Sequence, residues 1–204
     1  MIGISVIGYG YWGPNLVRNF SQVPEARVVS VCDQRADRRA HVESVYPAIR
    51  TCSDVRDVWS NPAVQAVAIA TPVSSHYELA LQALRAGKHV FVEKPFTTTS
   101  AQAERLIEEA EKRQLTLMVD HTFVYTSAVR KIKELVDSGS IGKVHYYDSV
   151  RINLGLFQHD VNVLWDLAVH DLSIMDYLFE RSPVTIAATG MAHVPGQPEN
   201  LAYL

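Results

Sequence analysis

The chain has 204 residues, of which 48% are hydrophobic and 20% are charged, and its net charge is −3. These values are typical of a globular protein with one large domain or two small ones, and they exclude a nucleic-acid binder held by a basic surface. The first residues lack the features of a signal peptide and no apolar run reaches bilayer length, so we expect a cytoplasmic protein that does not bind membranes.

The first 121 residues alternate strand patterns with helix patterns. Four helices are predicted. The first runs from the glycine cluster to Phe20, the second covers residues 36–45, the third ends at Gly87, and the fourth begins after Ser100, which serves as its N-cap. Strands are predicted over residues 2–7, 27–31, 64–70, 90–92 and 115–119. Short links between alternating elements predict an α/β fold, with a parallel sheet covered by helices on both faces.

The pattern changes after His121. A helix that ends at Gly139 is followed by a long alternating run over residues 143–153, which is typical of an antiparallel strand. A second helix is predicted over residues 163–179 and a second long strand over residues 184–194. We therefore expect a second, α+β domain with an open, mostly antiparallel sheet.

A glycine-rich motif, Gly-Tyr-Gly-Tyr-Trp-Gly, lies between the first strand and the first helix. Glycines alone could simply form a turn, but a strand before and a helix after them are typical of the G-x-G-x-x-G dinucleotide site. There the helix N-terminus favours the negative pyrophosphate. We expect the cofactor to contact Gly8, Gly10, Tyr11, Trp12 and Gly13.

Asp33 ends the second strand, 20 residues after Gly13. A carboxylate at this point can hold the ribose hydroxyls and repel a 2′-phosphate, which predicts NAD rather than NADP as the cofactor. Arg35 and Arg38 could each meet a 2′-phosphate, but we expect both to be solvated at the start of a helix.

The chain has two cysteines, Cys32 and Cys52. They form neither a metal-ligand pattern nor a disulfide framework, which is consistent with a reduced protein.

Glu93-Lys94-Pro95, together with the glycine motif, resembles the Gfo/Idh/MocA oxidoreductase family. The likeness also covers ATPVSSHYELALQALRAGKHVFVEKP, VDHTFVY, RINLG and WDLAVHDLSI. Within the family, the chain is most similar to the branch of UDP-N-acetylhexosamine or UDP-N-acetylhexosaminuronate 3-dehydrogenases. The resemblance implies a Rossmann dinucleotide-binding domain over residues 1–121 and a substrate and oligomerisation domain over residues 122–204.

The resemblance also implies roles for residues of the first domain. Thr71 and Pro72 match the loop that lies against the cofactor, and His76 matches a residue near the pyrophosphate or ribose. Glu93 matches the carboxylate that contacts the nicotinamide ribose. Lys94 matches the catalytic lysine, which contacts both cofactor and substrate.

In the second domain, Asp166 and His170 match the family's D-x-x-x-H pair. They are one helical turn apart, so they could bind one substrate group or orient each other, although such a stripe could also be a solvated helix face. A metal site formed by this pair with His159 has no clear third ligand fixed in sequence, and we expect no metal. The other residues expected on the substrate side are Tyr125, Arg151 and Asn153.

The implied reaction is the oxidation of a secondary alcohol of a sugar or nucleotide sugar, most specifically at C3 of a UDP-N-acetyl sugar. Either Lys94 or His170 could take the hydroxyl proton, since both can serve in acid–base or electrostatic catalysis. Two alternatives stay open: a non-redox sugar enzyme that uses NAD transiently, and a dinucleotide-binding protein without catalysis.

The resemblance also bears on the end of the chain. Members of the family continue past the position of Leu204, which implies an incomplete second domain. When complete, the open sheet is expected to form a homo-oligomer.

Overall fold

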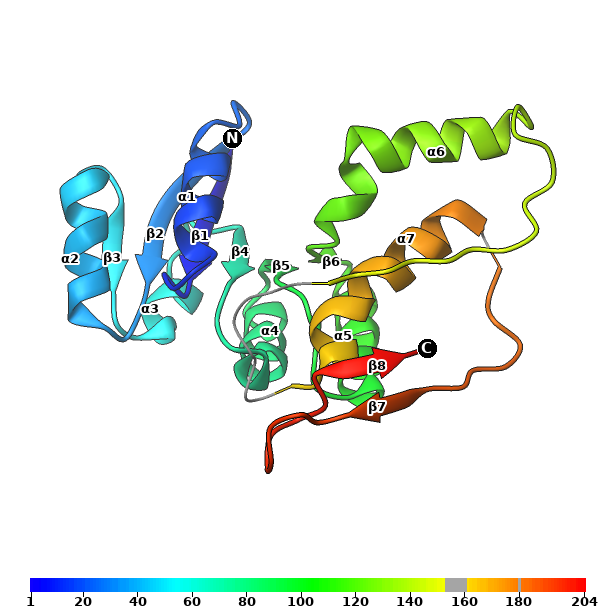
Figure 1. Ribbon diagram of the computed structural model, residues 1–204. Coiled ribbons are helices and arrows are strands. Elements are labelled where there is room, and N and C mark those ends of the chain that lie inside the picture. The colour runs from blue at the N-terminus through cyan, green and yellow to red at the C-terminus, as the bar shows by residue number, and fades with distance from the viewer. Residues whose placement is uncertain (153–160, 180) are drawn as a thin grey trace. The chain divides into compact units, whose positions relative to one another are not determined.

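The computed structural model describes residues 1–152, 161–179 and 181–204. The chain divides into two compact units, Met1–Asp120 and His121–Leu204 (Figure 1). In these described ranges, no helix combines the length and apolar composition that crossing a membrane would require.

The first unit is built on a six-stranded parallel sheet with the order β3-β2-β1-β4-β5-β6. Its strands are β1 (Ile2–Ile7), β2 (Ala26–Cys32), β3 (Arg50–Cys52), β4 (Ala66–Ile69), β5 (His89–Val92) and β6 (Leu117–Val119). The strand order reverses between β1 and β4, and in open parallel sheets ligands bind beyond the carboxyl ends of the strands at such a switch point.

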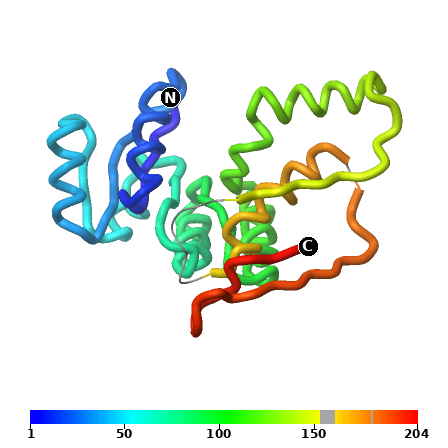
Figure 2. The backbone as a smooth tube through the Cα atoms, in the orientation of Figure 1, coloured from blue at the N-terminus to red at the C-terminus, as the bar shows by residue number. Residues whose placement is uncertain are grey.

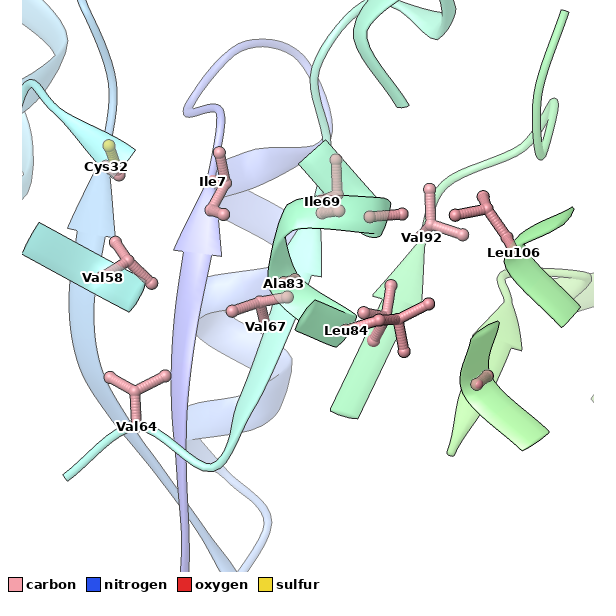
Figure 3. Close-up of a cluster of buried hydrophobic side chains, with 13 residues drawn as sticks. Ile7, Cys32, Val58, Val64, Val67, Ile69, Ala83, Leu84, Val92 and Leu106 are labelled. Atoms are coloured by element: carbon pink, nitrogen blue, oxygen red, sulfur yellow. The ribbon is translucent and has the colours of Figure 1, made fainter. Parts of the chain in front are cut away.

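Helices cover both faces of this sheet. They are α1 (Gly13–Ser21), α2 (Ala36–Val45), α3 (Val55–Trp59), α4 (His76–Arg85) and α5 (Ser100–Arg113). One apolar cluster joins strand residues to α3, α4 and α5, and includes Val58, Leu84 and Leu106 (Figure 3). A second cluster joins the strands to α1 and α2 through Val17 and Val42. The central strands are therefore buried on both sides, which explains their continuous apolar runs.

The predicted parallel α/β arrangement is confirmed, with small differences at its element boundaries. Strand β3 and the short helix α3 were not predicted. The predicted N-cap Ser100 is wrong: Thr99 has an extended backbone, and its hydroxyl accepts a hydrogen bond of 3.3 Å from the Gln102 N–H. Ser100 is instead the first helical residue, because the cap position requires a non-helical backbone.

The second unit contains helices and a small antiparallel sheet (Figure 1), and its helices appear as coils of the backbone tube in Figure 2. Its elements are the 3₁₀-helix Thr122–Tyr125, α6 (Ser127–Asp137), a π-helical turn at Leu164–Ala168, α7 (Val169–Phe179), β7 (Thr189–Met191) and β8 (Leu201–Tyr203). Strands β7 and β8 pair in antiparallel register. The predicted combination of a parallel sheet with a second, antiparallel sheet is thus confirmed, although the second sheet is smaller than expected.

The two long strands predicted in this unit are wrong. Residues 143–152, the described part of the first run, form no strand, and of residues 184–194 only Thr189–Met191 do. Alternating apolar residues need a neighbouring strand to bury one face. Here Ile152 is 86% exposed and Val184 is 98% exposed, so neither run has found such a neighbour within the described structure.

Candidate active site

Close backbone packing shapes the glycine turn after β1. Gly8 has a φ of +92°, and a Cβ atom there would lie 2.7 Å from the Ala70 carbonyl oxygen. At Gly13 a Cβ atom would lie 2.3 Å from the Gly8 carbonyl oxygen. At Gly10, by contrast, it would meet only the Arg38 guanidinium at 3.6 Å. Gly8 and Gly13 are thus required for the turn itself, whereas Gly10 leaves room for a ligand to approach the backbone.

The N-terminus of α1 opens directly from this turn. Trp12 occupies the cap position, Pro14 lies in the first turn, and no side chain in the described structure caps the helix. Tyr11 is 79% exposed, and its ring meets that of Trp12 edge to face. Within this first turn the Asn15 N–H donates to the Trp12 carbonyl oxygen at 2.9 Å, and the helix dipole favours a pyrophosphate at this end.

Asp33 is buried at the carboxyl end of β2. Its carboxylate accepts hydrogen bonds from the backbone N–H groups of Tyr9 at 2.7 Å and Arg35 at 2.8 Å. Burial acts to raise the pKa of Asp33, but these bonds and the Arg38 guanidinium hold it below its ordinary value. The side chain is therefore ionised at neutral pH and can accept hydrogen bonds from ribose hydroxyls. Together with the glycine turn and the α1 N-terminus, it fits NAD.

The two arginines at the start of α2 differ in their surroundings. Arg35 is exposed and pairs with Asp37, as expected for a solvated side chain. The expectation for Arg38 is wrong: its Nη1 lies 3.2 Å from an Asp33 carboxylate oxygen, and its side chain is 35% exposed. Arg38 follows Asp33 by five residues, so the first turn of α2 places it above the carboxylate.

Replacing Asp33 with serine is expected to weaken NAD binding and strengthen NADP binding, shifting the preference by at least about tenfold. The variant loses an acceptor for the ribose hydroxyls and releases Arg38 to pair with a 2′-phosphate. Titration calorimetry with both nucleotides measures the shift, and Arg35→Ala is the matched control. An unchanged preference in Asp33→Ser, or a gain that survives the further change Arg38→Ala, would contradict this account.

His76 links the loops that follow β4 and β5. Its ring is buried, with Nδ1 2.9 Å from the Pro95 carbonyl oxygen and Nε2 2.8 Å from the Thr71 carbonyl oxygen. The Thr71 hydroxyl accepts a 2.7 Å hydrogen bond from Ser75. Pro72, which precedes the 3₁₀-turn Val73–Ser75, is exposed. The structure thus gives His76 a positioning geometry between two backbone segments.

Glu93 directly follows β5 and is buried. Burial, and then the neighbouring carboxylate of Asp120 at the end of β6, raise the pKa of Glu93 to about 8, although Lys94 acts in the opposite direction. Its Oε1 atom is buried and has no hydrogen-bond partner among the described residues. Glu93 is therefore largely protonated at neutral pH. Asp120 was not predicted, although an acidic residue at the carboxyl end of a parallel strand is the signal that could have indicated it.

Replacing Glu93 with glutamine is expected to flatten the pH dependence of stability. The folded chain retains a proton on Glu93 that the unfolded chain loses above its ordinary pKa of 4.5. The free energy of unfolding should therefore fall as the pH rises from about 4.5 to about 8, by on the order of 5 kcal/mol, and then level off. Denaturant unfolding at about pH 5, 7 and 9, which spans this window, measures the slope.

Glutamine mimics the neutral acid, so Glu93→Gln should match the parent chain at the acidic end and exceed it at the alkaline end. The exposed Glu108 on α5 provides the control, Glu108→Gln. An equal slope in the parent chain and in Glu93→Gln would show that Glu93 ionises in the folded state as it does in water.

Lys94 lies immediately after Glu93 and is half-buried, and a cis peptide bond joins it to Pro95. It follows β5, two strands from β1 in the sheet order, so it extends beyond the same sheet edge as the glycine turn. A cation at this edge can stabilise an oxygen that gains negative charge.

In the second unit, the pairing of Asp166 with His170 stays a prediction, but the helix does not divide into a solvated polar face and a buried apolar face as expected. His170 is buried against the edge of the Phe123 ring, with 4.7 Å between the ring centroids, whereas Leu172 of the predicted apolar face is 40% exposed. Asp166 lies within the π-helical turn Leu164–Ala168. A π-turn holds more residues than an α-turn, so it shifts the phase of α7 relative to a regular helix.

Arg151, predicted to bind substrate, forms a two-point ion pair with Asp171 at 2.8 and 3.2 Å. Its guanidinium also lies 4.7 Å from the centre of the Phe123 ring. Burial acts to raise the pKa of Asp171, but hydrogen bonds from Arg151 and Ser149 hold it below its ordinary value. Asp171 was missed in sequence because only its neighbour His170 matched a motif.

Of the remaining predicted residues of this unit, Tyr125 lies within the described ranges. Tyr125 is 53% exposed and lies under the Arg130 guanidinium. Asn153 and His159 lie outside the described residues. Within the described ranges, no group of three or more His, Cys, Asp or Glu side chains is arranged to hold a metal ion.

Comparison with known proteins identifies both parts of the chain. Residues 2–121 match the family model described as an oxidoreductase family with an NAD-binding Rossmann fold, and residues 129–202 match the Gfo/Idh/MocA C-terminal domain. GenD2 from gentamicin A biosynthesis, whose structure was solved in complex with NAD, has the same fold with a TM-score of 0.87. It is 20% identical, over 98% of this chain and 60% of that protein.

Curated relatives include dehydrogenases of different substrates. The myo-inositol 2-dehydrogenase of Thermotoga maritima is 27% identical over 92% of this chain, and the UDP-N-acetylglucosamine 3-dehydrogenase of Acidithiobacillus ferrooxidans is 31% identical over 93% of it. The chain spans 58% of the length of each of these two relatives. The glycine turn, the ionised Asp33 and the family match together show that this chain belongs to the Gfo/Idh/MocA oxidoreductase family and carries its NAD-binding Rossmann domain.

Proposed function

We propose that the protein is an NAD-dependent oxidoreductase that oxidises a secondary alcohol of a sugar or polyol. The observation that carries this proposal is the Glu93-Lys94 pair at the end of β5, beyond the same sheet edge as the glycine turn and Asp33. When bound, the nicotinamide supplies the hydride acceptor. The protein then has to hold the alcohol, accept its proton and stabilise the charge on its oxygen.

Lys94 is assigned to the alcohol oxygen. Its positive charge would favour the alkoxide over the alcohol, which lowers the barrier to loss of the proton. Glu93, held largely in its protonated form, can donate a hydrogen bond to a hydroxyl and does not neutralise Lys94 as a carboxylate would. The buried acid and the lysine thus support the same step.

The proton acceptor is either Lys94 or His170. An imidazole has an ordinary pKa near the pH of the cell, which suits proton transfer. In the second unit His170 packs against Phe123 and lies beside the ionised Asp171, which would stabilise the imidazolium that forms. Asp166 is assigned to substrate binding.

For the substrate we propose a nucleotide-linked pyranose, oxidised at C3 as in a UDP-N-acetyl sugar. The motifs RINLG and WDLAVHDLSI support this choice, as does the 31% identity to a UDP-N-acetylglucosamine 3-dehydrogenase. An inositol dehydrogenase among the relatives supports a cyclic polyol as the second candidate.

A substrate screen tests the proposal. The chain is incubated with NAD and UDP-N-acetylglucosamine, UDP-glucose, N-acetylglucosamine or myo-inositol, and the formation of NADH and of the ketone is followed. We expect the highest kcat/KM for UDP-N-acetylglucosamine. Activity confined to myo-inositol would overturn the nucleotide-sugar assignment. Substrate consumption without NADH would indicate transient use of the cofactor, and NAD binding without turnover would indicate a non-catalytic protein.

A further inference from the structure

The two cysteines of the chain, separated in sequence, lie side by side in the sheet. Cys32 is the last residue of β2 and Cys52 the last residue of β3, and the two are direct partners in the parallel register. Cys32 belongs to the apolar cluster under α3, α4 and α5, and Cys52 packs against the same cluster. Figure 3 shows Cys32 at the end of its strand, above Val58. Both side chains therefore extend from the same face of the sheet.

The two thiols are free, and the Cys52 thiol donates a 4.0 Å hydrogen bond to the Val31 carbonyl oxygen. The interaction between the neighbouring thiols raises the pKa of Cys32 and lowers that of Cys52. Burial, Asp57 and Asp54 oppose the effect on Cys52, and Arg39 adds to it. Cys32 is buried, whereas Cys52 is half-buried. Because the thiolate is the reactive form of cysteine, Cys52 is the more reactive of the two thiols.

The backbone geometry suits a covalent bond between them. Directly paired residues on neighbouring strands have Cα atoms about 4.8 Å apart. Disulfide-bonded cysteines have Cα atoms roughly 4.4–6.8 Å apart, so the strands need not separate or slide for the sulfurs to join.

The same two residues support the dinucleotide site through their main chains. The Gly8 N–H donates to the Cys32 carbonyl oxygen at 2.8 Å, and the Asp33 N–H donates to the Cys52 carbonyl oxygen at 3.1 Å. Gly8 begins the glycine turn, and Asp33 carries the carboxylate assigned to the ribose. A shift of the backbone at either cysteine would therefore also move a residue of the cofactor site, because one hydrogen bond joins the two.

We propose that Cys32 and Cys52 form a reversible thiol–disulfide site, oxidised by hydroperoxides, whose closure weakens NAD binding. The Cys52 thiolate attacks a peroxide oxygen, so that the O–O bond breaks, hydroxide leaves and Cys52 becomes a sulfenic acid. The Cys32 sulfur then attacks the Cys52 sulfur and displaces the hydroxyl, which leaves as water with the Cys32 proton. In total, two thiols lose two electrons and two protons, and hydrogen peroxide is reduced to two molecules of water.

Closure would act on the cofactor site through geometry. A disulfide brings the sulfurs to about 2.05 Å and imposes a fixed torsion about the bond. The ends of β2 and β3 must adjust to it, and the peptide groups that hold Gly8 and Asp33 adjust with them. Hydrogen bonds to ribose and pyrophosphate depend on distances and angles within a narrow range, so such an adjustment lowers affinity.

The test compares the reduced 204-residue chain with the same chain after treatment with stoichiometric hydrogen peroxide. Mass spectrometry after thiol alkylation counts the free thiols, and calorimetry measures the NAD dissociation constant. We expect oxidation to remove both free thiols together with two hydrogen atoms of mass, and to raise the dissociation constant by at least about tenfold. A thiol reductant should restore both values.

The matched control is Cys52→Ser, which keeps the size of the half-buried side chain and cannot form the disulfide. In the reduced state it should bind NAD like the parent chain, and peroxide should not change its affinity. An equal loss of affinity in this variant would place the oxidation elsewhere and overturn the proposal. So would oxidation of Cys52 to sulfinic acid without a disulfide, or a disulfide that leaves the affinity unchanged. Because mass spectrometry detects the disulfide without any turnover, failure of the proposed sugar oxidation would not be mistaken for failure of this site.

Discussion

The variant Lys94→Ala should lose turnover by about 100-fold or more while its NAD dissociation constant stays within about threefold of the parent value. Lys94 extends beyond the end of β5, and its proposed partner is the alcohol oxygen rather than the glycine turn that holds the pyrophosphate. Steady-state kinetics with the best substrate of the screen and NAD calorimetry measure the two effects separately. The control is Lys112→Ala, which removes an exposed lysine of α5 and should change neither value.

Equal losses in NAD affinity and turnover would show that Lys94 binds cofactor and has no separate role in the reaction. Lys94→Arg sharpens the test, because arginine keeps the positive charge and cannot act as a base at neutral pH. Retained activity in Lys94→Arg would assign Lys94 to charge stabilisation and leave the proton to His170.

His170 needs its own comparison, because its buried ring also supports the second unit. We expect His170→Asn to lower turnover by about 100-fold, the size typical of a lost acid–base group. Phe123→Leu disturbs the same packing without removing a titratable group and serves as the control. Wild-type turnover in a folded His170→Asn chain would show that His170 contributes to packing and has no role in the reaction.

A large effect on stability is expected at Gly13, where alanine should prevent the native turn from forming. The added Cβ atom would lie 2.3 Å from the Gly8 carbonyl oxygen, and both atoms belong to backbone segments that cannot move apart without breaking the turn. We expect a loss of several kcal/mol in the free energy of unfolding, about the size of a severe core mutation. Denaturant unfolding of the parent and variant chains measures it.

Gly10→Ala is the control, because its Cβ atom would meet a flexible arginine side chain at 3.6 Å. This variant should fold with near-parent stability but bind NAD at least about tenfold more weakly, since the methyl group occupies the space through which the pyrophosphate approaches. A stable Gly13→Ala chain would show that the turn can form with another backbone geometry.

The first unit could be predicted well from sequence because local patterns and tertiary structure agree there. The sequence contains the apolar run of β1, the glycines after it and Asp33 after β2. Each of these features is typical of a Rossmann fold, and each lies in the structure where that fold places it. The elements missed, β3 and α3, are the short ones, where three to five residues carry little periodicity.

The relations between side chains from different elements were less predictable. The effect of Asp120 on Glu93 depends on β5 and β6 being neighbours, and the ion pair between Arg151 and Asp171 joins an irregular segment to a helix. The Cys32–Cys52 contact depends on the register of two strands. None of these contacts between elements can be derived from the spacing of the residues in the sequence. The strand predictions over residues 143–153 and 184–194 were wrong for a related reason. Alternation of apolar and polar residues indicates which face of a strand would be buried, but not whether a partner strand is present.

The central place of β1 has a consequence for synthesis on the ribosome. The strand is made first, yet it pairs with β2 on one side and with β4 on the other, and Gly3 contacts a residue 62 positions later in the chain. Until β4 has left the exit tunnel, one edge of β1 has no native partner. Parallel pairing over such separations is slow to form and leaves strand edges exposed to other chains. Growing chains of this protein should therefore depend on chaperone binding most strongly between the emergence of β1 and that of β4.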